Sequence, residues 1–356
     1  MAEDTKISEL KKLVDEKNWT KALPLAKTLA EEGNAYAACL LGIMYEEGKS
    51  VPSDLTKASD FYEKAAAGGE SDAMDRLGKL YLEGRGVEKD YKKAFYLFKT
   101  AAEKGCGEAQ ADLAHCYEIG FGTKADFQKA FEWYVKAAGQ GQVLVMKKLG
   151  DLYYFGCEEP GGPSEDLKKA REWYEKAADF GNADALYRLG IMYKSGEGVD
   201  QDYARALKYF LKAADQGHPD AELDAGFCYF YGRGTKEDRD EALKWLKKSA
   251  DQEEPIALYA LGCLYLQGRG VEQNSRLAVK YLQKSVEANY DEAAKLLGDI
   301  YSEGKYVEKD EKAAMEWYHI AVEFGSEEAA SSLAYLQMKG KKDRNRYMDF
   351  FRHKVQ

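Results

Sequence analysis

The sequence predicts an all-α protein, a right-handed superhelical solenoid of antiparallel helix hairpins with a 36-residue repeat. Three sets of residues predict it, because small residues, tyrosines and glycines each return in phase along the chain. The small-residue slot is occupied by Gly42, Gly78, Ala114, Gly150, Gly190, Gly226, Gly262, Gly298 and Ala334. Successive positions lie 36 residues apart, except for a step of 40 between Gly150 and Gly190. Self-similarity at such a period is the signature of a repeat architecture.

Each repeat predicts two helices joined by a glycine-containing turn. The spacing i, i+4, i+7, i+8 places four residues on one face of a first helix. In the first full repeat these are Ala37, Leu41, Met44 and Tyr45. Gly48 follows, where a helix C-terminus favours left-handed backbone. Asp54, an N-capping residue type, then precedes a second helical stretch. One hairpin cannot bury its apolar face alone, so stacked neighbours must supply the core.

The chain resembles the Sel-1-like repeat family, a relative of the tetratricopeptide repeat. The motif Leu-Gly-x-x-Tyr-x-x-Gly-x-Gly-Val is read from Leu77 to Val87, and again from Leu189 to Val199. It continues in Trp-Tyr-x-x-Ala-Ala, for example from Trp133 to Ala138. The resemblance implies a TPR-like solenoid with adaptor roles in complex assembly, protein quality control, signalling or host–microbe contact.

The repeat frame predicts three regions. Residues 1–33 are expected to form N-terminal capping helices. Residues 34–340 are expected to form the solenoid, about eight full repeats plus a ninth first helix. Residues 341–356 are aromatic and basic, and either cap the open end or form a docking motif for a partner. The extra residues between Gly156 and Asp166 predict a tolerated surface loop.

Composition limits the class of partner and the compartment. The net charge of −10 and the pI of about 5.2 argue against a nucleic-acid binder, which needs a basic face. No apolar stretch is long enough to predict insertion into a membrane, and the acidic N-terminus does not read as a signal peptide. Six cysteines share no repeat position, which favours reduced thiols and a cytoplasmic location.

Motifs that suggest catalysis are weak. The segment Gly42–Ser50 resembles a phosphate-binding loop, but its glycines are one residue too far apart and both belong to repeat columns. The four histidines, none at metal-ligand spacing, are His115, His218, His319 and His353. We therefore expect no enzyme activity, no catalytic residue, no cofactor and no metal. A regulatory subunit of an enzyme complex, or a self-assembling rod that forms homo-oligomers, remains the alternative.

The columns that vary between repeats indicate where a partner would bind. First-helix slots in the middle of the chain are expected to be exposed and carry large apolar residues: Tyr154, Phe155, Tyr187, Ile191, Leu223, Phe227, Phe230, Tyr231, Tyr259 and Leu266. Lys147, Asp151 and Lys194 would be the polar rim. Clustered exposed aromatics suggest a binding patch for a protein or peptide on the concave face. The alternative is tighter local packing within the solenoid.

Overall fold

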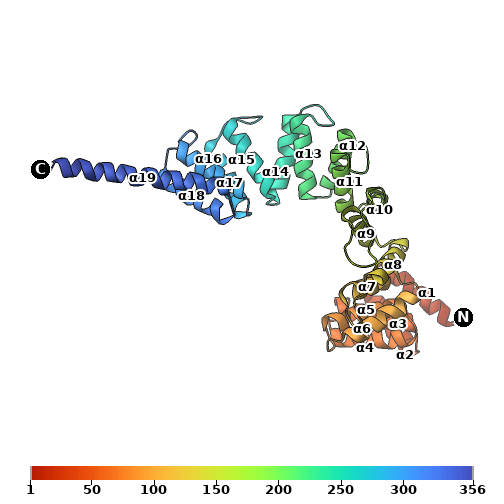
Figure 1. Cartoon of the computed structure of the whole chain (residues 1–356). Coiled ribbons are helices and arrows are strands. Elements are labelled where there is room, and N and C mark those ends of the chain that lie inside the picture. The colour runs from red at the N-terminus through yellow and green to blue at the C-terminus, as the bar shows by residue number, and fades with distance from the viewer. Residues whose placement is uncertain (1, 355–356) are drawn as a thin grey trace. The chain divides into compact units, whose positions relative to one another are not determined.

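The computed structural model describes residues 2–354, with side chains described for residues 4–340. The predicted capping segment 341–356 therefore lies outside the described side chains. Within the described range the chain folds into nineteen α-helices and no strand (Figure 1). No helix in this range is sufficiently long and apolar to span a bilayer.

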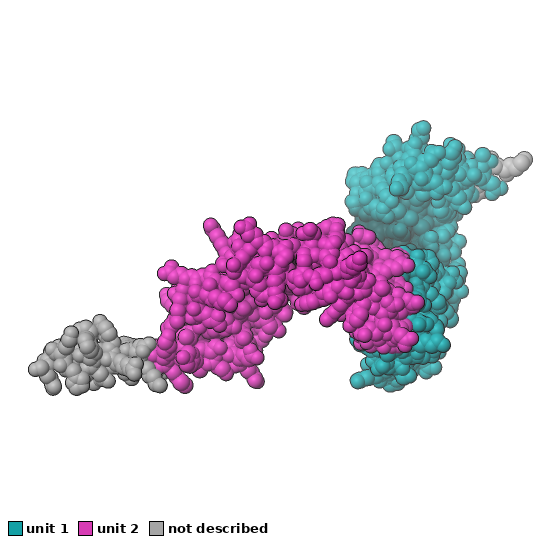
Figure 2. Space-filling view, turned by 90° about the horizontal axis from the view of Figure 1, so that it is seen from above, with its two compact units in different colours: residues 1–180 teal, residues 181–356 magenta. Residues whose placement is uncertain are grey.

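The helices fall into two compact units, residues 1–180 and residues 181–356, which are coloured separately in Figure 2. The helices of unit 1 are α1 (Ala2–Asp15), α2 (Trp19–Glu31), α3 (Ala35–Glu47), α4 (Leu55–Ala67), α5 (Ser71–Glu83), α6 (Tyr91–Glu103), α7 (Gly107–Ile119), α8 (Phe127–Gly139), α9 (Val143–Phe155) and α10 (Leu167–Asp179). The helices of unit 2 are α11 (Ala183–Ser195), α12 (Tyr203–Ala214), α13 (Pro219–Tyr231), α14 (Arg239–Asp251), α15 (Pro255–Gln267), α16 (Ser275–Glu287), α17 (Asp291–Glu303), α18 (Glu311–Glu323) and α19 (Glu327–Lys354).

Consecutive helices pack as hairpins, as the repeat predicts. Within each unit every first helix packs against the second helix of its own repeat, and that helix packs against the first helix of the next repeat. The predicted all-α solenoid of helix hairpins is confirmed. We call α3, α5, α7 and the following odd-numbered helices the first helices of their repeats.

The helix boundaries follow the predicted caps. Asp54 accepts a hydrogen bond from the backbone N–H of Lys57 at 3.0 Å, and Asn274 does the same for Leu277 at 3.0 Å. The first helices from α3 to α17 end at a glycine with positive φ, as at Gly48 with φ of 71°. These contacts satisfy backbone groups that a helix end leaves unpaired.

The longer turn in unit 1 is closed without changing the repeat frame. The N–H of Asp166 donates to the carbonyl of Tyr153 at 2.8 Å, which is the bond that Asp54 makes to Tyr45 in a turn of ordinary length. The N–H of Cys157 donates to the carbonyl of Pro163 at 2.9 Å and ties the extra residues into a loop. The four-residue insertion is thus accommodated outside the helices.

The small-residue slot sets how closely the two helices of a hairpin approach. A Cβ atom added to Gly190 would lie 2.5 Å from a ring carbon of Phe210, and one added to Gly42 would lie 2.4 Å from Tyr62. Both rings are fully buried, so they cannot move aside without disturbing the core. Ala114 occupies the same slot with a methyl group and is fully buried.

We predict that Gly190→Val lowers the free energy of unfolding by about 2–3 kcal/mol, because the branched side chain overpacks the contact with Phe210. The matched control is Gly139→Val, since a Cβ at helical Gly139 meets no atom within 4 Å. Urea unfolding of both variants measures the difference. Equal midpoints for the two variants would show that the slot does not limit helix approach.

Candidate functional site

The predicted site residues lie on first helices, but in both units. Lys147, Asp151 and Tyr154 belong to α9 of unit 1. The remaining residues lie in unit 2 on α11, α13 and α15: Tyr187, Ile191, Lys194, Leu223, Phe227, Phe230, Tyr231 and Tyr259. Unit 2 therefore holds the larger part of the predicted patch, and its geometry is described by itself.

The expectation that all these slots are exposed is wrong for three residues. Leu223 is 7% exposed, Phe230 is 8% exposed and Leu266 is 3% exposed. The reason is the partner helix: α14 carries Leu246 and α16 carries Leu282 where the other repeats carry a core ring. Leu223 and Phe230 belong to the same buried cluster as Leu246, and Leu266 belongs to that of Leu282. Burial of these three residues matches the packing alternative.

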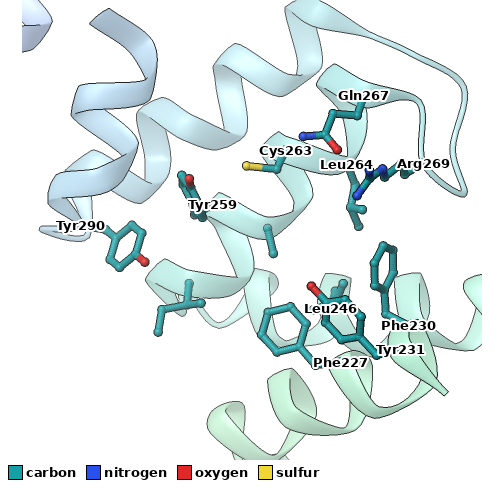
Figure 3. A pocket seen from close by; sticks show the side chains of 12 residues that line it. Phe227, Phe230, Tyr231, Leu246, Tyr259, Cys263, Leu264, Gln267, Arg269 and Tyr290 are labelled. Atoms are coloured by element: carbon teal, nitrogen blue, oxygen red, sulfur yellow. The ribbon is translucent and has the colours of Figure 1, made fainter. Parts of the chain in front are cut away.

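Three other predicted residues are half-buried or exposed around a cavity of about 300 Å³, which we call the aromatic pocket. Phe227 and Tyr231 of α13 and Tyr259 of α15 line it, together with the buried Phe230. Its other lining residues are Leu246, Ile256, Ala260, Cys263, Leu264, Gln267, Arg269 and Tyr290. Figure 3 shows Tyr259 and Tyr290 at one end and Gln267 with Arg269 at the other. The volume suits one large side chain better than a whole cofactor.

A smaller cavity of about 160 Å³ adjoins the aromatic pocket, and Phe227 and Tyr231 line both. Its remaining lining comes from Lys194, Tyr203, Asp224, Cys228 and Arg233. Lys194 donates to Asp224 at 2.6 Å, which neutralises a carboxylate on a buried residue. Lys194, predicted as a rim residue, thus lines the second cavity but is held by an ion pair.

Three groups that line the aromatic pocket, the hydroxyls of Tyr259 and Tyr290 and the thiol of Cys263, have raised pKa values and are therefore neutral at neutral pH. Burial raises the pKa of the Tyr259 hydroxyl and of the Cys263 thiol. Burial and then the charge of Glu292 raise the pKa of Tyr290. The lining therefore offers aromatic faces, neutral hydroxyls, an amide and the positive charge of Arg269. Such a site binds an apolar group and supplies hydrogen bonds at its edge.

The other predicted residues make contacts of their own. In unit 2, Tyr187 stacks on His218 with ring centroids 4.6 Å apart, and Ile191 is half-buried. In unit 1, Tyr154 contacts the rings of Phe155 and Tyr174. Lys147 and Asp151 form an ion pair at 2.7 Å. None of these residues lines the two cavities of unit 2 described above.

Sequence reasoning missed the polar end of the aromatic pocket. Arg269 and Arg233 follow the glycine that ends a first helix, so they lie outside the helical periodicity on which the prediction depends. The signal was present in the turn column, where a cation recurs after the glycine at Lys49 and Arg85.

Hairpins of this length, glycine-capped and stacked in register, define a helical repeat protein with a side-chain-sized pocket on its first helices. The model of the Sel1 repeat matches residues 35–70, 71–106, 107–142, 144–182, 183–218, 219–253, 255–290 and 291–325. The chain belongs to the Sel1 repeat family, as its motifs predicted.

Two solved structures resemble the chain along most of its length. One is a protective antigen of uropathogenic Escherichia coli with an SLR fold, 33% identical, with a TM-score of 0.81; the match covers 89% of this chain and 67% of that one. The other is a Sel1 repeat protein from Oxalobacter formigenes, 30% identical, with a TM-score of 0.67 and coverage of 88% and 90%. No curated protein matches the chain.

We predict that substitutions at buried and at exposed residues of the predicted patch change the free energy of unfolding by different amounts. Leu223→Ala should lower the free energy of unfolding by about 2–4 kcal/mol, because it empties a buried position. Tyr231→Ala, at a residue 58% exposed, should cost less than about 1 kcal/mol. Thermal or urea unfolding compares them, and a larger loss for Tyr231→Ala would contradict the assignment.

Proposed function

We propose that this chain is a non-catalytic adaptor that binds a peptide segment of another protein along the first helices of unit 2, on the concave face of the solenoid. The aromatic pocket takes one bulky apolar side chain of that segment. The observation that carries the proposal is the convergence of Phe227, Tyr231 and Tyr259 on a cavity of side-chain size.

The character of the surface supports binding. Tyr231 is 58% exposed although it belongs to an aromatic cluster with Phe227 and Phe230. Interface hot spots are enriched in aromatic residues that surround such pockets. The smaller cavity on the far side of Phe227 and Tyr231 offers a second place for a neighbouring side chain. An extended segment could fill both, since its side chains follow one another at short intervals.

The chemistry of the pocket supports binding over nucleophilic catalysis. A reactive cysteine needs a lowered pKa, and burial raises that of Cys263. All six cysteines are free thiols, which supports our proposal of a reducing, cytoplasmic setting.

We predict that peptides selected from a random displayed library on the immobilised full chain lose affinity about tenfold or more for the Phe227→Ala, Tyr259→Ala double variant, since it removes two pocket walls. Fluorescence anisotropy with a labelled selected peptide measures this. Tyr231→Ala repeats the test at an exposed side chain, where loss of folding is not an alternative explanation.

The control is Tyr96→Ala, which removes an aromatic residue 68% exposed on α6 of unit 1 and far from the pocket in sequence. It should leave the affinity unchanged. Failure to select any peptide, or equal affinity of wild type and both pocket variants, would refute the proposed function.

A further inference from the structure

A cation follows the glycine that ends several first helices, and in unit 1 it is neutralised within its own turn. Lys49 pairs with Glu47 at 2.5 Å, and Arg85 pairs with Glu83 at 3.0 Å. The carboxylate stands two residues before the cation in both turns. A cation near a helix C-terminus is favourable in itself, because it faces the negative end of the helix dipole.

The same column at the aromatic pocket lacks that carboxylate. Two residues before Arg233 stands Tyr231, and two residues before Arg269 stands Gln267. Both arginines are exposed, and across the part of the chain with described side chains neither has a carboxylate within ion-pair distance. The helix dipole explains why a cation stands after the helix end. It does not explain why these two turns lack the glutamate that precedes the cation in unit 1, since acidic residues are in excess in this chain, whose net charge is −10.

Both unpaired arginines lie at the cavities. Arg269 lines the aromatic pocket and Arg233 lines the adjoining cavity. Arg233 also lies over the ring of Tyr231, 5.2 Å from its centroid. Stacking on an aromatic face holds the guanidinium without satisfying its charge or its forked donors, which remain available to a carboxylate.

The opposite end of the aromatic pocket has the opposite charge. Tyr290 lies at that end in Figure 3. Burial raises the pKa of its hydroxyl, and the negative charges of Glu292, Asp291 and Glu254 raise the pKa further. A ligand with a negative group is attracted to the arginine end and repelled from the tyrosine end. The charges therefore favour one orientation of an acidic ligand.

We propose that the segment bound by the aromatic pocket is acidic: a bulky apolar side chain enters the pocket, and a neighbouring Asp or Glu pairs with Arg269 or Arg233. This inference rests on the proposed function and adds the class of peptide. Arg85 is paired with a carboxylate of its own chain, that of Glu83. For Arg233 and Arg269 a carboxylate of the bound peptide has the same role.

The test uses labelled peptides with a central Phe, flanked by Asp, by Asn or by Lys, with the other positions randomised. With the full chain at low salt, the Asp set should bind about tenfold more tightly than the Asn set, and the Lys set most weakly. The Arg233→Gln, Arg269→Gln double variant should bring the Asp set to the affinity of the Asn set. Added salt should have the same effect.

Three further variants distinguish an effect of charge on peptide binding from a loss of folding. Arg85→Gln removes the arginine of the same column in unit 1 and should leave binding unchanged. Gln267→Glu restores the carboxylate beside Arg269, at an exposed side chain, and should weaken the Asp set about threefold through internal competition. Arg269→Glu should transfer the preference from the Asp set to the Lys set.

The outcomes distinguish the two proposals. Equal binding of the Asp and Asn sets, abolished by Phe227→Ala with Tyr259→Ala, would overturn the acidic ligand and leave the proposed function standing. Binding of none of the sets, together with no peptide selected from the random library, would refute the pocket as a peptide site. A loss of binding in Arg85→Gln equal to that in the Arg233→Gln, Arg269→Gln double variant would place the charge effect outside the pocket.

Discussion

The close approach of a glycine on the first helix and a large side chain on the second is the contact on which each hairpin depends. The distances from a Cβ placed on the glycine to the facing side chain are 2.4 Å at Gly42, 2.6 Å at Gly78, 2.5 Å at Gly150, Gly190 and Gly298, 2.8 Å at Gly226 and 2.7 Å at Gly262. Only a residue with little or no side chain fits, so the slot must recur once per hairpin. The period of the sequence is the spacing of this contact, and the buried core forms around it.

The second-helix side chain that faces the small-residue slot also determines which residue type stands near it on the first helix. A buried tyrosine hydroxyl needs an acceptor, and it finds one on the first helix. The pairs are Tyr62 with Glu46 at 2.5 Å, Tyr134 with Glu118 at 2.7 Å, Tyr174 with Asp151 at 2.8 Å and Tyr318 with Asp299 at 2.7 Å. Leu246 and Leu282 have no hydroxyl, and their repeats place Phe230 and Leu266 on the first helix instead. Part of the variation on this face is therefore internal packing.

This dependence explains how far the sequence could predict the molecule. The hairpins, the aspartate caps and the glycine-ended helices follow from residue types at fixed local spacings, so they were predictable. Even Glu253 and Asn289, which break a glycine column, take the left-handed backbone of that column, with φ of 62° and 65°. Exposure of Leu223 and Phe230 was not predictable from their own positions, because it depends on the volume of side chains on the neighbouring helices. Arg269 was missed because it belongs to a turn.

The aromatic pocket lies in two repeats that lack two interactions found in other repeats: the hydrogen bond of a core tyrosine and the ion pair of the turn cation. In two adjacent hairpins of unit 2, leucine replaces the core tyrosine, so the first helix needs no acceptor for a tyrosine hydroxyl and carries Phe230 or Leu266 at that slot. In the turns of the same two hairpins, tyrosine and glutamine replace the glutamate that would neutralise the arginine. Either change alone leaves only an apolar patch or an unpaired charge. Their coincidence places the apolar cavity and the unsatisfied cation side by side, which is the combination that recognition of an acidic, apolar segment requires.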